Sequence, residues 1–92
     1  MYRVRTHNRR VDRELDSLSP QTYDRIAEAI SALANDPRPR GTIKLGDNIY
    51  RVRVGNYRII YLIDDVAQLV SIGAVRRRNE ATYRRPDDLF RP

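Results

Sequence analysis

The spacing of apolar residues predicts a short strand and two helices in the first third of the chain. Residues 2–5 alternate apolar and basic side chains, which is typical of a half-buried strand. Apolar residues then recur at intervals of three and four, as on one face of a helix. The positions are Val11, Leu15 and Leu18, followed by Tyr23, Ile26, Ala27, Ile30, Leu33 and Ala34. Ser19 and Pro20 begin the second helix as its cap and first residue, and the Asn-Asp-Pro of residues 35–37 ends it.

The apolar period then changes to two, which predicts three strands. The first two strands, residues 49–54 and 57–63, are rich in Val, Ile and Tyr and are joined by Gly55-Asn56. A third strand follows over about residues 68–77. The order β-α-α-β-β-β predicts an α+β fold in which an antiparallel four-stranded sheet carries both helices on one face.

The remaining segments hold more proline, glycine and charge. We expect residues 36–48, with two prolines and two glycines, to form an ordered loop. We expect the polar residues 79–92 to form a mobile tail, because Leu89 and Phe90 are almost its only large apolar side chains. Residues 1–92 are long enough for one domain.

Gly55-Asn56 fixes which side chains of the hairpin share a face. This pair suits a two-residue turn whose central residues both take positive φ. One face then holds apolar pairs, which we assign to the core under the helices: Val54 with Tyr57, Val52 with Ile59, and Tyr50 with Tyr61. The other face holds Arg53 opposite Arg58 and Arg51 opposite Ile60. Opposed guanidinium groups repel each other, and a bound phosphate would relieve this repulsion.

The last strand extends both faces if its alternation is regular. Its predicted core positions are Val70, Ile72 and Ala74, and its predicted outer positions are Ser71, Gly73, Val75 and Arg77. Small outer residues would leave a hollow in which Arg77 converges with the three hairpin arginines. The same pattern is also compatible with a row of solvated arginines on an open sheet.

The net charge of the chain indicates which class of partner it binds. Lys and Arg total 18 against 12 acidic residues, which gives a net charge of +6, and 17 of the 18 are Arg. Guanidinium groups bind phosphate with two parallel hydrogen bonds, so a basic surface of this kind favours nucleic acid or an anionic membrane. A solvated arginine-rich surface would have the same composition.

Other compositional features exclude several classes of site. The chain has no cysteine and one histidine, His7, which excludes disulfides and leaves almost no ligands for zinc. We therefore expect neither a metal nor a cofactor. No apolar run approaches the roughly 20 residues that span a bilayer, and we expect a cytoplasmic protein that does not act on a membrane.

Two segments resemble the RelE/ParE toxin superfamily, and its RelE branch in particular. Residues 50–65 read YRVRVGNYRIIYLIDD and are similar to the family's hairpin, YR-x-R-x-GDYR followed by alternating Val, Ile and Tyr and by Asp-Asp. Residues 74–84 read AVRRRNEATYR and resemble its closing strand and tail. The resemblance implies a type II toxin that enters the 70S ribosome and cuts mRNA in the A site.

The same resemblance implies site residues, position by position. Arg58 matches the hairpin arginine, Arg77 the arginine that ends the last strand, and Tyr83 the tail tyrosine; these three are the expected catalytic residues. Arg51, Arg53 and Arg76 are expected to bind RNA phosphate. The family usually has lysines where this chain has Arg51 and Arg53, and the choice of Arg77 over Arg76 depends on the strand phase.

RNA cleavage needs a base, because the ribose 2′-OH must lose its proton as it attacks the adjacent phosphorus. Guanidinium groups stabilise the charge on the phosphoryl oxygens but hardly release a proton. Neighbouring arginines favour the phenolate of Tyr83, which makes it the candidate base, with Glu80 as the alternative. Tyr83 could also stack on a base without chemistry. We assign His7 to a cap or to the surface.

Two other functions remain open at this point. A ParE-like inhibitor of DNA gyrase would have no catalytic site, and a nucleic-acid-binding module would bind RNA without cutting it.

If the protein is a toxin, its basic surface favours an acidic, partly disordered antitoxin that folds on binding. We expect it to lay a helix or strand against the sheet edge and the two helices, in a toxin–antitoxin hetero-oligomer.

Overall fold

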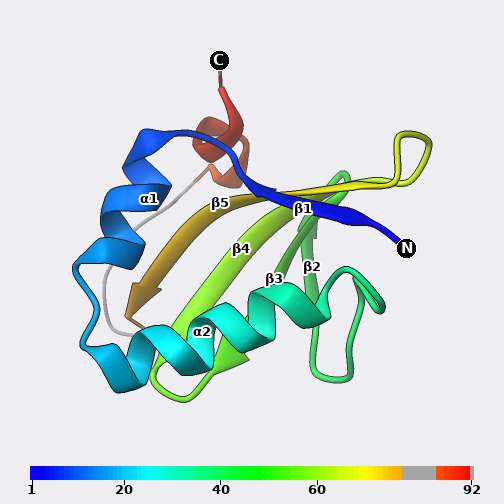
Figure 1. The fold of residues 1–92 in the computed structure, drawn as a ribbon. Helices are drawn as coiled ribbons and strands as arrows, with labels where there is room; N and C mark the ends of the chain where they lie inside the picture. The colour runs from blue at the N-terminus through cyan, green and yellow to red at the C-terminus, as the bar shows by residue number, and fades with distance from the viewer. Residues whose placement is uncertain (78–84, 92) are drawn as a thin grey trace.

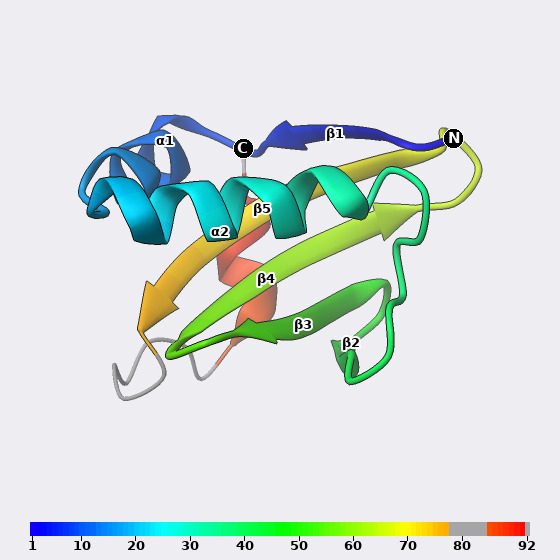
Figure 2. The ribbon, with the colours of Figure 1, turned by 60° about the horizontal axis from the view of Figure 1, so that its bottom comes forward.

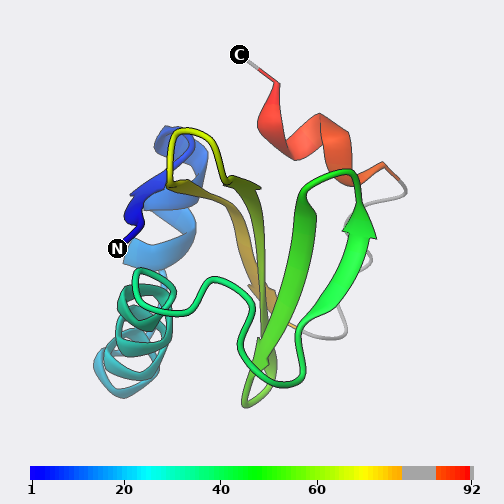
Figure 3. The same cartoon turned by 90° about the vertical axis from the view of Figure 1, so that its right-hand side faces the viewer.

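The computed structural model describes residues 1–77 and 85–91. The elements, in chain order, are β1 (Arg3–Thr6), α1 (Arg9–Asp16), α2 (Pro20–Ala32), β2 (Ile43–Gly46), β3 (Ile49–Val54), β4 (Tyr57–Asp64), β5 (Leu69–Arg77) and the 3-10 helix η1 (Pro86–Phe90). One sheet with the strand order β1-β5-β4-β3-β2 runs through the molecule. Helices α1 and α2 cover one side of this sheet, and η1 lies on the other (Figures 1 and 3).

The predicted α+β fold with two helices is confirmed, but the sheet differs from the prediction in two respects. It has five strands among the described residues, because residues 43–46 form β2 inside the segment expected to be a loop. It is also mixed rather than antiparallel, since β1 pairs with β5 in parallel (Figure 2). The strand β2 was missed because four residues with an irregular register show too little alternation of apolar and polar side chains. The parallel pairing was missed because this alternation carries no information on strand direction.

Helix α2 begins as the sequence predicts. The Ser19 side chain accepts a hydrogen bond from the backbone N–H of Thr22, and Pro20 occupies the first turn of α2. Asn8 caps α1 by accepting from the backbone N–H of Val11 at 3.3 Å. No helix in the described part of the chain combines the length and the apolar character that crossing a membrane requires.

The β3–β4 hairpin has the predicted register. Val54 pairs with Tyr57, Arg53 with Arg58, and the remaining pairs follow in step through Ile49 and Leu62. Gly55 has φ +59°, whereas Asn56 is not among the positive-φ residues, so only the first central residue of the turn takes the left-handed conformation. The two-residue turn still sets the faces as expected.

The main core lies between the sheet and the two helices. Its fully buried side chains come from β4, β5 and both helices, and include Tyr61, Ile59, Ile63, Val70, Ile72, Val11, Ile26 and Leu33. A smaller cluster on the opposite side of the sheet contains Ile49, Ile60, Ala74 and Leu89, with Leu45, Leu62 and Phe90 packed against it. The opposite side is therefore apolar where η1 covers it.

The predicted phase of β5 is wrong beyond Ile72, because a β-bulge interrupts the strand. Tyr61 pairs with Ile72 and Ile60 with Ala74, so Gly73 is an extra residue. A bulge of this kind inverts the alternation that follows it. As a result Ala74 lies on the η1 side and Val75 in the helix-side core, the reverse of the prediction.

The expected hollow above Gly73 is filled by Phe90. A Cβ atom added at Gly73 would overlap the Phe90 ring, so the absence of a side chain there is what lets η1 lie on the sheet. Arg10 donates to the carbonyl oxygen of Leu89 at 3.3 Å, and Leu89 is 7% exposed. The predicted mobility of residues 79–92 concerns in part residues outside those described, and it stays a prediction.

Candidate functional site

Arginines occupy the hairpin end of the sheet on the side away from α1 and α2. Arg53, Arg58 and Arg76 lie directly opposite one another on β3, β4 and β5. Arg51 lies one row further along β3, opposite Ile60. We call these four residues the arginine face. Neighbouring strands are about 4.8 Å apart, so three guanidinium-bearing residues stand within about 10 Å across the sheet.

Two of these arginines are partly withdrawn from solvent. Arg51 and Arg58 are half-buried, whereas Arg53 is exposed. The Nε atoms of Arg51 and Arg58 are buried and have no hydrogen-bond partner within the described chain. A buried donor without a partner costs about 1–3 kcal/mol. The arrangement suits the binding of a phosphate group.

Arg77 does not belong to the arginine face, contrary to the prediction. Because of the bulge it pairs with Tyr57 and lies on the helix side, where its Nε donates to the Tyr57 hydroxyl at 3.4 Å. Arg76 takes the place expected for Arg77. The sequence prediction chose Arg77 and made that choice depend on the strand phase, and this phase places Arg76 on the arginine face.

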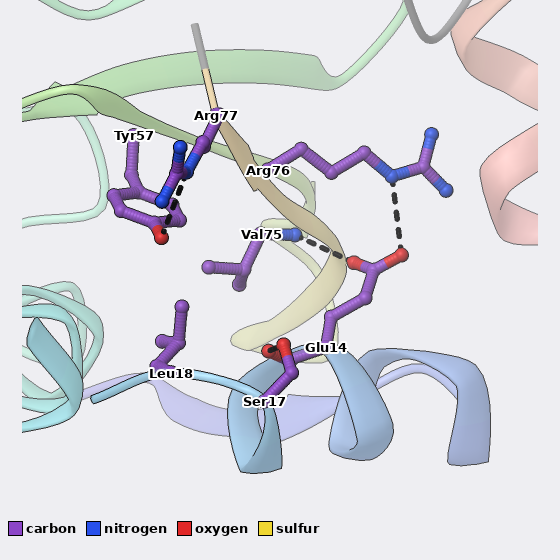
Figure 4. A pocket seen from close by; sticks show the side chains of 7 residues that line it. All are labelled: Glu14, Ser17, Leu18, Tyr57, Val75, Arg76 and Arg77. Carbon is purple, nitrogen blue, oxygen red and sulfur yellow. Dashed lines mark hydrogen bonds and ion pairs between the residues drawn. The ribbon is translucent and has the colours of Figure 1, made fainter. Parts of the chain in front are cut away.

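A pocket of about 300 Å³ adjoins the end of β5 (Figure 4). Its lining is Glu14, Ser17, Leu18, Tyr57, Val75, Arg76 and Arg77. The Glu14 carboxylate receives a hydrogen bond from the backbone N–H of Val75 at 2.8 Å and an ion pair from Arg76 at 3.1 Å. Sequence reasoning missed Glu14, because nothing in the pattern of α1 shows that this acid reaches β5.

Two predicted candidates for the base, Tyr83 and Glu80, lie outside the described residues. Their assignment stays a prediction. His7 lies where β1 ends, its Nε2 donates to the carbonyl oxygen of Arg91 at 2.9 Å, and its ring meets Phe90 edge to face at 5.6 Å. It connects two segments of the chain, in keeping with its assignment to a cap or to the surface.

At the other end of the sheet, charged and phenolic groups tie the loop after α2 to the β4–β5 turn. Arg38 pairs with Asp65 at 2.9 Å, and Tyr2 also donates to this carboxylate. The hydrogen bonds from Arg38 and Tyr2 lower the pKa of Asp65. Burial raises the pKa of Tyr61, whose hydroxyl donates to the carbonyl oxygen of Pro37 at 2.7 Å. In residues 1–77 and 85–91, no three acidic or histidine side chains cluster as metal ligands.

Known proteins share both this sequence and this fold. Residues 4–82 match the family described as the ParE toxin of the type II toxin–antitoxin system parDE. The chain belongs to the RelE/ParE family of toxins. A protein of Methanocaldococcus jannaschii named as the toxin RelE1 is 30% identical over 90 residues, which are 92% of this chain and 98% of the relative.

Solved structures of RelE/ParE-family proteins agree with the fold. A chain of the archaeal RelE–RelB complex from Pyrococcus horikoshii is 29% identical and has a TM-score of 0.74 over 87% of this chain and 98% of that one. A chain of the toxin–antitoxin complex RelBE2 from Mycobacterium tuberculosis is 30% identical, with a TM-score of 0.72 over 86% of this chain and 93% of that one. Isolated E. coli RelE, at 15% identity, has the same fold, with a TM-score of 0.75 over 88% of each chain.

Proposed function

We propose that this RelE/ParE-family toxin is an endoribonuclease that cuts mRNA in the A site of the 70S ribosome. The observation that carries the proposal is the arginine face, in which four arginines lie on three adjacent strands and the buried Nε donors of Arg51 and Arg58 have no partner among the described residues. A surface of this charge and geometry suits an RNA phosphate, and the relatives named RelE favour the same branch.

In this proposal the reaction is attack by the ribose 2′-OH on the adjacent phosphorus. The P–O bond to the 5′-oxygen breaks, this oxygen takes up a proton from solvent, and a 2′,3′-cyclic phosphate and a 5′-OH result. Arg58 and Arg76 bind the scissile phosphate and stabilise the charge that builds on its oxygens. Arg51 and Arg53 bind phosphate of the same strand. These roles need fixed positive charge rather than a removable proton, which suits arginine.

We assign the proton transfer from the 2′-OH to Tyr83, with Glu80 as the alternative. A phenol has a reference pKa of about 10, and guanidinium groups nearby favour its ionised form. The chain offers few other candidates, because its single histidine is bonded to Arg91 on the η1 side. The ribosome would supply the alignment of the substrate, and the activity would then be cytoplasmic.

The proposed partner is an acidic antitoxin, in a toxin–antitoxin hetero-oligomer. Two of the structurally similar chains come from toxin–antitoxin complexes. Beside the edge strand β1, a groove of about 180 Å³ runs between the sheet and the two helices. Its apolar lining is Val4, Leu15, Tyr23, Ala27, Ile30 and Ile72, which suits the apolar face of a helix or strand.

The test is to add the purified protein to programmed ribosomes and to map mRNA ends by primer extension, with free mRNA alongside. We expect cuts in the A-site codon of ribosome-bound message and none in free message. If folded protein cuts neither sample, the proposal fails.

A second candidate, inhibition of DNA gyrase, is favoured by the ParE name of the matching family. A supercoiling assay separates it from RNA cleavage, because a gyrase inhibitor blocks supercoiling and leaves ribosome-bound message intact.

A further inference from the structure

The edge of β5 is covered by two different elements in turn. Strand β1 pairs with it only as far as Ile72, where the backbone N–H of His7 makes the last hydrogen bond at 2.8 Å. The chain then turns into α1, whose cap is Asn8. Beyond Ile72 it is the side chain of Glu14, one helix turn and a half later, that reaches the strand.

One carboxylate oxygen of Glu14 takes over the role of a strand partner. Its Oε1 accepts from the backbone N–H of Val75 at 2.8 Å, at the edge where β1 no longer runs. This contact fixes the position of the Glu14 carboxylate along β5, next to Arg76, which is the β5 member of the arginine face.

The other oxygen of Glu14 binds two arginines. Its Oε2 accepts from Nε of Arg76 and from Nη1 of Arg10, each at 3.1 Å. The side chains of Glu14 and Arg76 are 18% and 19% exposed, so this pair is shielded from solvent far more than a surface ion pair. Figure 4 shows Arg76 extended, with Nε above the carboxylate and the two terminal nitrogens beyond it.

This contact has two consequences for the arginine face. It places a negative charge at the β5 end of a row of three guanidinium groups, which offsets their repulsion. It also fixes the Arg76 side chain, which would otherwise sample many rotamers, before any substrate arrives. Because Nε donates to Glu14, the guanidinium plane of Arg76 is held in one orientation, in which its terminal nitrogens lie beyond the carboxylate (Figure 4).

We propose that Glu14 is a positioning residue that holds Arg76 in the orientation in which it binds the scissile phosphate. The inference rests on the proposed function, and it deepens that function by assigning a role to an acid that does not touch the substrate. A purely structural acid at this position would instead hold α1 against β5, and its loss would affect cleavage only by lowering the stability of the fold.

Glu14→Gln separates the two roles. Its amide oxygen can still accept from the Val75 N–H, but its NH₂ group then faces Arg76, so the charge and the Arg76 contact are lost. Removal of a negative charge beside the site favours RNA binding, whereas loss of orientation slows the chemical step. We therefore expect a KM for programmed ribosomes that is unchanged or lower, and a kcat about 10-fold lower.

The matched control is Asp16→Asn, which removes the same charge from an exposed position of the same helix. We expect its kcat to stay within about two-fold of wild type, since additive surface changes are small. The decisive comparison is the double variant with Arg76→Ala. Because Glu14 acts through Arg76, Glu14→Gln should not slow Arg76→Ala any further. A wild-type kcat for Glu14→Gln, or an equal slowing in both backgrounds, overturns the proposal.

If Glu14→Gln fails to fold, Glu14→Asp takes its place, because the shorter side chain keeps the charge but cannot reach both the Val75 N–H and Arg76 Nε at their present distances. We expect its kcat to fall about 10-fold in the wild-type background and not to fall further in an Arg76→Ala background. A wild-type kcat for Glu14→Asp, or an equal slowing in both backgrounds, overturns the proposal.

A wild type that cuts no message refutes the proposed function but leaves the positioning testable by NMR. We expect the Nε–H signal of Arg76, assigned by its loss in Arg76→Lys, to exchange slowly with water. Exchange at the rate of an exposed arginine overturns the placement of Arg76 by Glu14.

Discussion

Gly73→Ala should destabilise the protein through a single contact, that between the sheet and the Phe90 ring. The added Cβ would overlap Cζ and Cε1 of Phe90, so the ring must move away from the strand. The backbone at Gly73 does not have a positive φ, so space alone decides the cost. Loss of a half-buried aromatic contact costs about 1–2 kcal/mol, and for a chain of this size the Tm falls by roughly 5–15 °C.

The assay is thermal unfolding followed by circular dichroism, with Gly46→Ala as the control. In the part of the chain that the structure describes, a Cβ at Gly46 meets only Asp87 Oδ1, at 3.9 Å, so this variant should keep the wild-type Tm. In a Phe90→Ala background the cost of Gly73→Ala should largely disappear, since the two side chains no longer compete for one space. A Gly73→Ala variant as stable as wild type would refute the placement of η1 on the sheet.

Four further predictions concern the site and the pH dependence of stability. Arg76→Ala should lower the rate of message cleavage about 100-fold, and Arg77→Ala much less, in single-turnover assays on programmed ribosomes; equal losses contradict the strand phase. Tyr83→Phe should remove most of the cleavage while leaving ribosome binding intact, and a wild-type rate excludes it as the base. The pKa of Asp65 is lowered in the folded protein, so its ionised carboxylate stabilises the fold above about pH 4, and this stabilisation is lost as the pH falls through the pKa of the folded state. In denaturant titrations, the free energy of unfolding of Asp65→Asn should therefore fall less steeply at acid pH than that of wild type. The pKa of Tyr61 is raised, so stability is lost as the pH rises beyond about 10, and Tyr61→Phe should flatten that loss.

The hairpin was predictable because its register depends on local chemistry. A two-residue turn at Gly55-Asn56 leaves one possible pairing, and the alternation of apolar and basic residues then assigns both faces. The positions of Arg51, Arg53 and Arg58 on one face followed from the sequence alone. Ser19 and Pro20 likewise marked the start of α2 through a contact between near neighbours.

The errors came from features that depend on distant parts of the chain. A glycine inside a strand pattern, such as Gly73, is a known sign of a bulge. The space that this glycine leaves is filled by the Phe90 ring, which lies 17 residues later in the sequence. The bulge then moved Arg77 off the arginine face. Glu14 looks like any acid on an amphipathic helix, and its role depends on where β1 ends beside β5. Such contacts are set by tertiary packing and have no local pattern.

In the function proposed above, the toxin cleaves ribosome-bound message through the ribose 2′-OH, at a phosphate bound by the arginine face. The most direct measurement compares two messages on programmed ribosomes, identical except for a single 2′-deoxy sugar at the cleaved nucleotide. We predict that the all-ribose message is cut in the A-site codon to leave a 2′,3′-cyclic phosphate, and that the deoxy message stays intact there. Equal cleavage of both messages, or of neither, would contradict the account.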